Sequence, residues 1–298
     1  MSYGSATTAE HVSEYFERIY PGRASPALIE DFENRYRLVG YSPLVEITIG
    51  QAAQLQKGLG SAYVVRAGMR YSAPYIDDAV GECVNGGATK LVGVILSPQF
   101  SSFIMEGYKT AFMHAADACG VGQYVVAGTW ADEAHYVELL AKRTTQALKN
   151  LQKKYGVLVP VVFTTHSLPQ RVVEKDPSYL MQLQATIAAV LLKLDHVPQW
   201  YAAYQSAGHT PEVWLKPDVV DVLKELRDQK APAVLIVPIQ FLSDHLEVLY
   251  DLDIAAKKQC DDFGIAYHRI ELPNTDPLFL ASLAATVHTY TQDKTSMY

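Results

Sequence analysis

The sequence has 298 residues, of which 49% are hydrophobic and 19% are charged, a globular composition with enough apolar material for two sizeable cores. Its formal net charge of -7 excludes a global basic field, so no nucleic acid is expected as a partner. The three cysteines, Cys83, Cys119 and Cys260, lie far apart, which argues for a reducing compartment and against both a disulfide framework and a four-cysteine iron–sulfur cluster.

The first residues lack the pattern of a targeting segment. Met1–Glu10 has no basic region and no apolar region of the kind that a secretory signal needs. Met1-Ser2-Tyr3-Gly4 instead has the pattern of the end of a strand and its turn, so we expect most of a first buried strand to be missing. No apolar run approaches the length of a membrane span, which predicts a cytoplasmic protein without integral membrane association.

Short apolar runs alternate with longer amphipathic stretches along the rest of the chain. The runs are continuous in Val, Ile, Leu and Tyr, which is typical of strands buried on both faces of a parallel sheet. The expected strands are Ala62–Arg66, Leu91–Leu96, Tyr124–Ala127, Val157–Thr164, Trp200–Tyr204, Ala233–Pro238 and Ile265–His268. The expected helices are Ala9–Tyr20, Pro26–Val39, Ile47–Leu59, Pro74–Val84, Ile104–Ala118, Glu133–Lys154, Leu180–Leu194, Pro217–Gln229, Asp244–Lys258 and Pro277–Thr291.

This alternation predicts an α/β fold of doubly wound sheets. The length of the chain favours two such sheets over one. We expect a first domain over residues 1–135, with its first strand truncated, and a second over residues 136–273. A C-terminal helix within residues 274–298 is expected to pack back on the first domain.

Ligands of open α/β sheets bind outside the carboxyl ends of the strands, so the turns after the strands are the places to examine. His166 follows the expected strand Val157–Thr164, and Pro169 stops the strand from continuing. A neutral imidazole there can bind a metal ion or accept a proton. It can equally be a structural histidine that caps the strand.

A second segment follows the expected strand Ala233–Pro238. Ser243 is a candidate N-cap for the next helix, which places Glu247 in the first turn and Asp251 on the same face. Two stacked carboxylates can pass on a cation or a proton, although acids are also favoured there by the helix dipole alone. A third segment, Gln205–Asp218, is polar and rich in proline. It either lines a pocket with Trp214 as an aromatic wall or is an ordered surface loop.

These segments together resemble the ferrochelatase family. The resemblance rests on three patterns in family order: H-S-L-P at His166–Pro169, Q-S-x-G-x-T-P-x-x-W-L-x-P-D at Gln205–Asp218, and D-H-L-E-V-L-Y-D at Asp244–Asp251. Shorter matches extend it over nearly the whole chain: Tyr3-Gly4, Ser42-Pro43-Leu44 and Ser97-Pro98-Gln99-Phe100-Ser101.

The resemblance implies two Rossmann-like domains of the chelatase fold with a porphyrin cleft between them. It also implies that the enzyme inserts Fe2+, its substrate, into a porphyrin in heme biosynthesis. His166 and Glu247 correspond to the family's catalytic pair, which handles the metal and accepts the pyrrole protons. Insertion of a divalent ion releases two protons, so a base beside the ring agrees with this role. Asp251 falls on a possible entry path for the metal.

Tyr3 narrows the expected substrate. A tyrosine at this position resembles the coproporphyrin ferrochelatase branch of Gram-positive bacteria, where the phenol oxygen can bind the product iron axially. Coproporphyrin III carries four propionates, so cationic or hydrogen-bonding groups should surround it. The candidates are Arg23, Arg35, Ser42, Arg70, Tyr108 and Trp214. We expect a monomer whose partners are coproporphyrin III and ferrous iron.

Three departures from the family pattern concern affinity and metal entry. Tyr20-Pro21 precedes Gly22-Arg23 where the branch often has a basic residue, and position 70 is Arg where close relatives often have Lys. The acidic series ends at Ala255, which weakens the case for an outer Mg2+ site. The alternatives are a protoporphyrin IX ferrochelatase, a chelatase for another divalent metal such as cobalt or nickel, and a non-catalytic porphyrin- or heme-binding protein.

Overall fold

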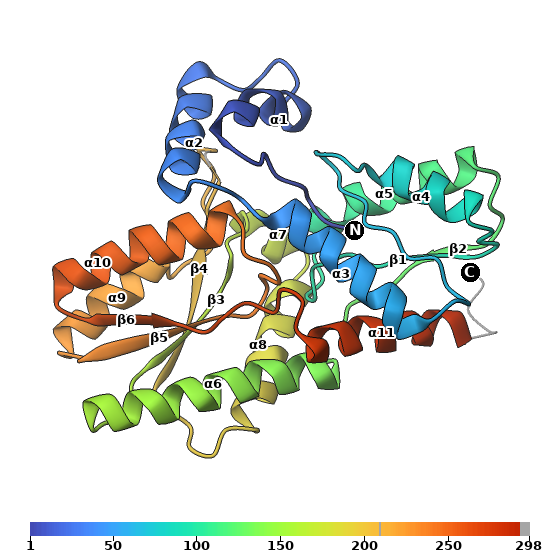
Figure 1. Ribbon diagram of the computed structural model, residues 1–298. Coiled ribbons are helices and arrows are strands. Elements are labelled where there is room, and N and C mark those ends of the chain that lie inside the picture. Colours follow the sequence, from blue (N-terminus) through green and yellow to red (C-terminus); the bar gives the residue numbers. More distant parts are fainter. Residues whose placement is uncertain (209, 293–298) are drawn as a thin grey trace. The chain divides into compact units, whose positions relative to one another are not determined.

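The computed structural model describes residues 1–208 and 210–292 (Figure 1). His209 and residues 293–298, the end of the expected C-terminal segment, lie outside the described residues. The chain divides into two compact units. Unit 1 contains Met1–Trp130, Ser243–Leu246 and the described residues from Asn274 on, and unit 2 contains Ala131–Leu242 and Glu247–Pro273.

From β1 on, strands and helices alternate along the described chain, and the strands pair in parallel, which confirms the predicted α/β class. The strands are β1 (Leu91–Gly93), β2 (Tyr124–Val126), β3 (Val161–His166), β4 (Trp200–Gln205), β5 (Ala233–Pro238) and β6 (Ala266–Arg269). The helices of the first half are a 3-10 turn (Ala9–His11), α1 (Val12–Ile19), α2 (Pro26–Val39), α3 (Leu44–Leu59), α4 (Ile76–Asn85), α5 (Ser102–Ala118) and α6 (Ala134–Tyr155). Those of the second half are α7 (Gln170–Lys175), α8 (Ser178–Leu191), α9 (Val219–Asp228), a π-helix (Val248–Ala256), α10 (Lys257–Phe263) and α11 (Pro277–Gln292).

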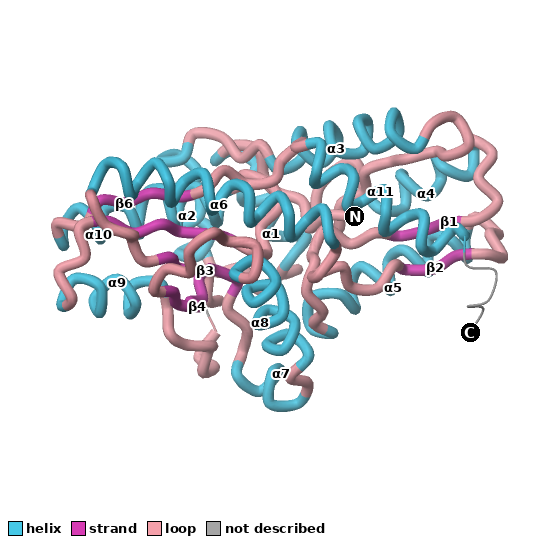
Figure 2. The backbone as a smooth tube through the Cα atoms, turned by 90° about the horizontal axis from the view of Figure 1, so that it is seen from below, coloured by secondary structure: helices cyan, strands magenta, loops and turns pink. Residues whose placement is uncertain are grey.

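Unit 2 is built on a fully parallel sheet with the strand order β4-β3-β5-β6. Every residue of β5 is buried, because helices cover both faces of the sheet. α9 and α10 pack on one face and α6 on the other (Figures 1 and 2). Val162 and Ile236 belong to one apolar cluster with Leu223 of α9 and Leu252 of the π-helix. Burial on two sides explains why these strands lack polar alternation.

The direction in which the chain adds strands to this sheet reverses once. From β3 the chain moves to β4 on one side, and it then returns past β3 to β5 and β6 on the other side. The topological switch point therefore lies at the carboxyl ends of β3 and β5, the position where open α/β sheets bind their ligands.

Unit 1 contains the parallel pair β1–β2. Ile76 of α4 and Phe112 of α5 share an apolar cluster with Leu91 of β1. The C-terminal helix α11 packs against α3. The expected strand Ala62–Arg66 was wrong as a strand: the run is present but has no ladder partner among the described residues, since pairing begins only at Met69, opposite Ser2.

The structure also corrects the ends of several elements. Ser243 does not cap the helix that carries Glu247, because that helix begins at Leu246, and the Ser243 hydroxyl accepts a hydrogen bond from Gln51 at 2.9 Å. Strand β3 begins at Val161 rather than Val157, because Pro160 has no N–H for a ladder. The short helix α7 was not expected, since six residues are too few to show a helical period.

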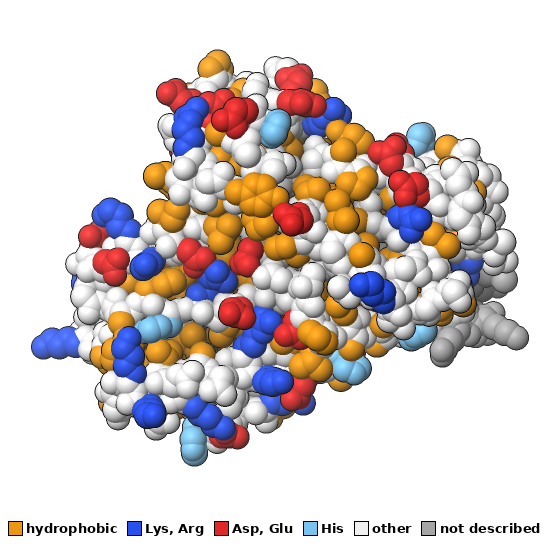
Figure 3. Space-filling model, viewed as in Figure 1, with side chains coloured by type: hydrophobic (Ala, Val, Ile, Leu, Met, Phe, Trp, Pro, Cys, Tyr) orange, Lys and Arg blue, Asp and Glu red, His pale blue; other side chains and the backbone are white. Residues whose placement is uncertain are grey.

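No helix of the described residues has both the length and the apolar character needed to span a membrane. On the face shown in Figure 3, Lys and Arg side chains are interspersed with Asp and Glu. This mixed pattern agrees with the charge balance of the sequence.

Candidate functional site

His166 is the last residue of β3, at the switch point of the unit 2 sheet. Its Nδ1 lies 2.5 Å from the carbonyl oxygen of Ser167. A carbonyl oxygen only accepts, so Nδ1 carries a proton, and in the neutral imidazole Nε2 then keeps its lone pair. That nitrogen can therefore take up a proton or bind a metal ion.

Glu247, in the first turn of the helix after β5, lies next to this nitrogen. The distance from His166 Nε2 to Glu247 Oε2 is 3.8 Å. It is too long for a direct hydrogen bond. It suits an ion held between the two groups, because metal–ligand bonds of about 2.1 Å on each side span it. The two side chains are 30% and 39% exposed, so a ligand has access to both.

Two buried polar residues hold the backbone of His166. The side-chain oxygen of Gln240, just after β5, accepts a hydrogen bond from the His166 N–H at 2.9 Å. The hydroxyl of Tyr179, on α8, lies 2.7 Å from the His166 carbonyl oxygen and 2.9 Å from the same Gln240 oxygen. Burial raises the pKa of Tyr179, so this hydroxyl remains a donor. Neither residue was a candidate from sequence, because nothing local connects α8 or position 240 to His166.

Tyr179→Phe should therefore disturb the site without changing its reactive groups. We expect roughly tenfold slower metal insertion, because loss of one hydrogen bond loosens the orientation of the imidazole. The comparison is with Tyr155→Phe, which removes a hydroxyl that bonds to His268 elsewhere in unit 2 at 3.1 Å. Equal insertion rates in the two variants would contradict the positioning role.

The H-S-L-P segment is also held by the loop that follows β4. Ser167 donates its N–H to the Gln205 carbonyl oxygen at 2.7 Å, and Leu215 donates its N–H to the Leu168 carbonyl oxygen at 2.9 Å. Trp214 lies on this loop, and its indole N–H donates to Thr210 at 3.3 Å. Two motifs about 40 residues apart thus brace one another. The buried amide of Gln205, opposite His166 in the ladder, has no partner among the described residues.

The helix after β5 is a π-helix from Val248 to Ala256, which contains Asp251. π-Helical turns are rare and occur frequently at functional sites. The Asp251 carboxylate accepts a hydrogen bond from the Ser206 hydroxyl, which links the helix to the end of β4. Asp251 thus follows Glu247 along the same helix, as the sequence suggested.

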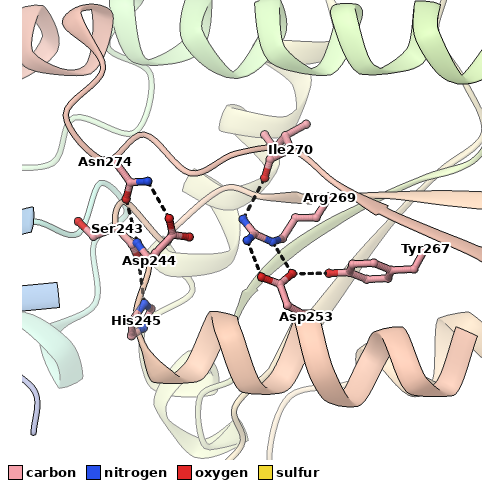
Figure 4. A network of polar contacts seen from close by, with 8 residues as sticks. All are labelled: Ser243, Asp244, His245, Asp253, Tyr267, Arg269, Ile270 and Asn274. Carbon is pink, nitrogen blue, oxygen red and sulfur yellow. Dashed lines mark hydrogen bonds and ion pairs between the residues drawn. The ribbon is translucent and has the colours of Figure 1, made fainter. Parts of the chain in front are cut away.

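A bidentate ion pair fixes the same helix to β6 (Figure 4). Arg269 Nε and Nη2 donate to the two oxygens of Asp253 at 2.8 and 2.6 Å, and the Tyr267 hydroxyl donates to Asp253 at 3.2 Å. In unit 1, the Asp244 N–H donates to the Asn274 side chain at 2.9 Å, just before that helix begins (Figure 4). The paired charge-assisted bonds between Arg269 and Asp253 restrict the motion of the helix that carries Glu247.

Unit 1 brings three of the predicted porphyrin contacts together. The guanidinium carbon of Arg70 lies 5.9 Å from the ring centre of Tyr3 and 5.2 Å from that of Tyr108. Tyr71 joins them, with its ring 4.7 Å from that of Tyr3 and its hydroxyl 2.7 Å from Arg70. Cation–π contacts stabilise such a group. Tyr3 as a whole residue is 40% exposed, whereas desolvation by its surroundings raises the pKa of its phenol.

The other candidates of unit 1 lie on separate elements. Arg35, on α2, pairs with Asp31 at 2.7 Å. Ser42 is fully buried, and its hydroxyl accepts a hydrogen bond from Ser5 at 2.8 Å. Arg23 is exposed in the turn after α1. A porphyrin contact for each of these three stays a prediction.

No group of three or more His, Cys, Asp or Glu side chains gathers as a metal cluster within the described ranges. His166 Nε2 and Glu247 Oε2, two donor atoms of kinds that can bind a metal ion, approach to 3.8 Å.

Fold and site together define an α/β protein that holds a His–carboxylate pair at the switch point of a parallel sheet. Two solved structures share this fold. SirB from Bacillus subtilis with Fe3+ aligns with a TM-score of 0.54 at 16% identity, over 82% of this chain and 92% of its own. CbiX, the terminal enzyme of siroheme biosynthesis in denitrifying bacteria, aligns at 0.56 and 12% identity, over 83% and 92%.

Comparison of sequences gives the family. The ferrochelatase family matches residues 1–291. A coproporphyrin III ferrochelatase of Geobacillus thermodenitrificans is 34% identical over 298 residues, which cover 96% of this chain and 93% of the relative. A ferrochelatase of Herpetosiphon aurantiacus is 34% identical over 294 residues, 96% of each protein. The chain belongs to the ferrochelatase family, so its predicted resemblance is confirmed.

Proposed function

We propose that this enzyme inserts Fe2+ into coproporphyrin III and so produces coproheme in heme biosynthesis. The observation that carries the proposal is the 3.8 Å approach of His166 Nε2 and Glu247 Oε2 in a chain of the ferrochelatase family. Imidazole and carboxylate together suit ferrous iron, a borderline ion.

The two residues have complementary tasks in the proposed reaction. Entry of the metal displaces two pyrrole protons, which the pair accepts: the Nε2 of His166 takes one and the carboxylate of Glu247 takes the other. The carboxylate of Glu247 stabilises the imidazolium that results and the incoming cation. Asp251, next along the π-helix, supplies a further carboxylate on the route of the metal or the proton.

The choice of coproporphyrin rests on unit 1 and on the relatives. Tyr3 is proposed as the axial ligand of the product iron, and Arg70 beside it as a partner of a propionate. Arg23, Arg35, Ser42, Tyr108 and Trp214 are the further proposed contacts of the porphyrin. The relatives of Geobacillus thermodenitrificans and Bacillus subtilis bear the name coproporphyrin III ferrochelatase, at 34% and 32% identity.

The test is to measure anaerobic Fe2+ insertion by absorbance with coproporphyrin III and with protoporphyrin IX in parallel. It shows which porphyrin the enzyme prefers. We expect kcat/KM to be at least about tenfold higher with coproporphyrin III, because it offers four propionates instead of two to charged groups. A higher value with protoporphyrin IX would overturn the choice of substrate. Tight porphyrin binding without any turnover would favour the carrier alternative.

A further inference from the structure

The guanidinium of Arg70 lies against the surface of helix α5 in unit 1, at Gly107. A Cβ atom added to Gly107 with ideal geometry would lie less than 3.0 Å from Cζ, Nη1 and Nη2 of Arg70, closer than real Cβ atoms approach other atoms. An optimal contact between two carbon atoms is about 3.5 Å or longer. The guanidinium therefore occupies the space that a side chain at position 107 would fill.

Glycine is an unfavourable residue for the helix itself at this position. Gly107 lies in the interior of α5, which runs without interruption from Ser102 to Ala118. Alanine stabilises the interior of a helix more than glycine does, because glycine loses more backbone entropy on folding. A regular helical backbone makes no use of the conformational freedom of glycine. What distinguishes Gly107 here is the missing side chain, which leaves room for Arg70.

The backbone of Arg70 is held separately from its side chain. Arg70 and Tyr71 each donate an N–H to a carbonyl oxygen of the segment Ser2–Tyr3, at 3.1 Å in both cases. The guanidinium carbon lies 4.7 Å from the ring centre of Tyr71 and 5.2 Å from that of Tyr108, the residue after Gly107. A side chain at position 107 would thus leave the backbone in place and displace the guanidinium from these rings.

The same guanidinium is suited to bind an anion. It is half-buried, and its Nη2 donates to the Tyr71 hydroxyl at 2.7 Å. Within the part of the chain that the structure describes, no Asp or Glu forms an ion pair with Arg70. A planar guanidinium with N–H groups to spare and no carboxylate of its own matches the carboxylate of a ligand.

We propose that Gly107 is a positioning residue for porphyrin binding: it leaves the space in which Arg70 is held ready for a propionate of the substrate. This inference rests on the proposed function, in which Arg70 is the partner of a propionate. The space beside Gly107 suits arginine, because its flat guanidinium can lie against the helix. The compact ammonium of lysine has no such plane. Gly107 and Arg70 therefore act as one unit.

Gly107→Ala tests the proposal, and Gly81→Ala is its matched control. Gly81 also lies inside a helix of unit 1, α4, but a Cβ atom there would meet no other part of the protein within 4 Å. Binding of coproporphyrin III is measured by fluorescence titration without metal. We expect the dissociation constant to rise about five- to tenfold in Gly107→Ala and less than about twofold in Gly81→Ala, because only the first displaces a charged hydrogen-bond donor.

Two further measurements separate positioning from a structural role. Neither substitution should lower the unfolding temperature, since alanine favours a helix more than glycine. The kcat of metal insertion should change by less than about twofold in Gly107→Ala, because no proton-accepting group is altered. In an Arg70→Lys background, Gly107→Ala should weaken porphyrin binding by less than about twofold, because the guanidinium that it displaces is absent.

Three outcomes overturn the proposal. Gly107→Ala binds the porphyrin as tightly as Gly81→Ala, or it weakens binding equally with arginine and with lysine at position 70. In the third, Gly107→Ala unfolds at a lower temperature than Gly81→Ala, which assigns the glycine a structural role in the helix.

Arg70→Ala distinguishes failure of this proposal from failure of the proposed function. Unchanged porphyrin affinity in Arg70→Ala contradicts the contact between Arg70 and a propionate, and with it both proposals at this position. Weaker binding in Arg70→Ala but not in Gly107→Ala contradicts the role of Gly107 alone.

Discussion

His166→Ala should lower the rate of Fe2+ insertion by at least about 100-fold, while the affinity for the porphyrin changes by less than about twofold. The imidazole is the proposed base, with Nδ1 hydrogen-bonded to the Ser167 carbonyl oxygen and Nε2 free to accept a proton in the neutral ring, and alanine supplies no substitute. Insertion is followed anaerobically by absorbance. Porphyrin binding is measured separately by fluorescence titration without metal, so that loss of catalysis and loss of binding are told apart.

The chain provides a matched control for this variant. His135 and Glu133 form another histidine–glutamate pair, with His135 Nδ1 2.8 Å from Glu133 Oε1, at the exposed start of α6. His135→Ala removes the same side chain away from the switch point and should leave insertion unchanged. Turnover of His166→Ala close to that of the original chain would refute the catalytic role.

Glu247→Gln should also have a large effect: we expect the rate of Fe2+ insertion to fall by about 10- to 100-fold. Glutamine keeps the shape of the side chain but removes the charge that stabilises the cation and the protonated His166. The loss should therefore include a higher KM for Fe2+, with porphyrin affinity nearly unchanged. The rate is measured over a range of Fe2+ concentrations.

Glu138→Gln is the control for charge removal. Glu138 lies on α6 in unit 2 and pairs with Lys193 at 2.8 Å, so the same change there tests only the general loss of an acid. If Glu247→Gln and Glu138→Gln have the same rate and the same KM for Fe2+, the carboxylate of Glu247 has no part in the reaction.

The effects of the two substitutions on the rate of metal insertion should not be additive in free energy. Residues that act as one unit lose most of their joint contribution when either is removed. His166→Ala combined with Glu247→Gln is therefore expected to be little slower than His166→Ala alone. If the double variant is slower by the product of the two single fold-changes, His166 and Glu247 act independently of one another.

Much of the fold is readable from local sequence. β5 and α2 have the bounds that the sequence predicted, Ala233–Pro238 and Pro26–Val39. An uninterrupted apolar run identifies the first. For the second, Ser25 caps the helix by accepting from the Leu28 N–H at 3.2 Å, directly before Pro26. Such signals lie within a few residues of the element that they specify, so no tertiary information is needed.

The sequence by itself also determined the family, and it singled out His166 and Glu247 as the candidate centre of the site. His166 and Glu247 lie in motifs that can be recognised without coordinates, each after a strand of the expected sheet. What it left open was whether each was functional or merely a strand-end histidine and a helix-start acid. The 3.8 Å between them brings the two together as one pair, as the functional interpretation requires.

Only the tertiary structure decided the parts that depend on distant segments. Gln240 and Tyr179 reach His166 from other elements, and the helix after β5 takes a π form that its amphipathic pattern does not distinguish from an α-helix. The segment 62–66 has the composition of a strand, yet a strand exists only where a neighbour pairs with it. Local pattern encodes which residues prefer to be buried, whereas the partners that bury and bond them are chosen by the fold of the whole chain.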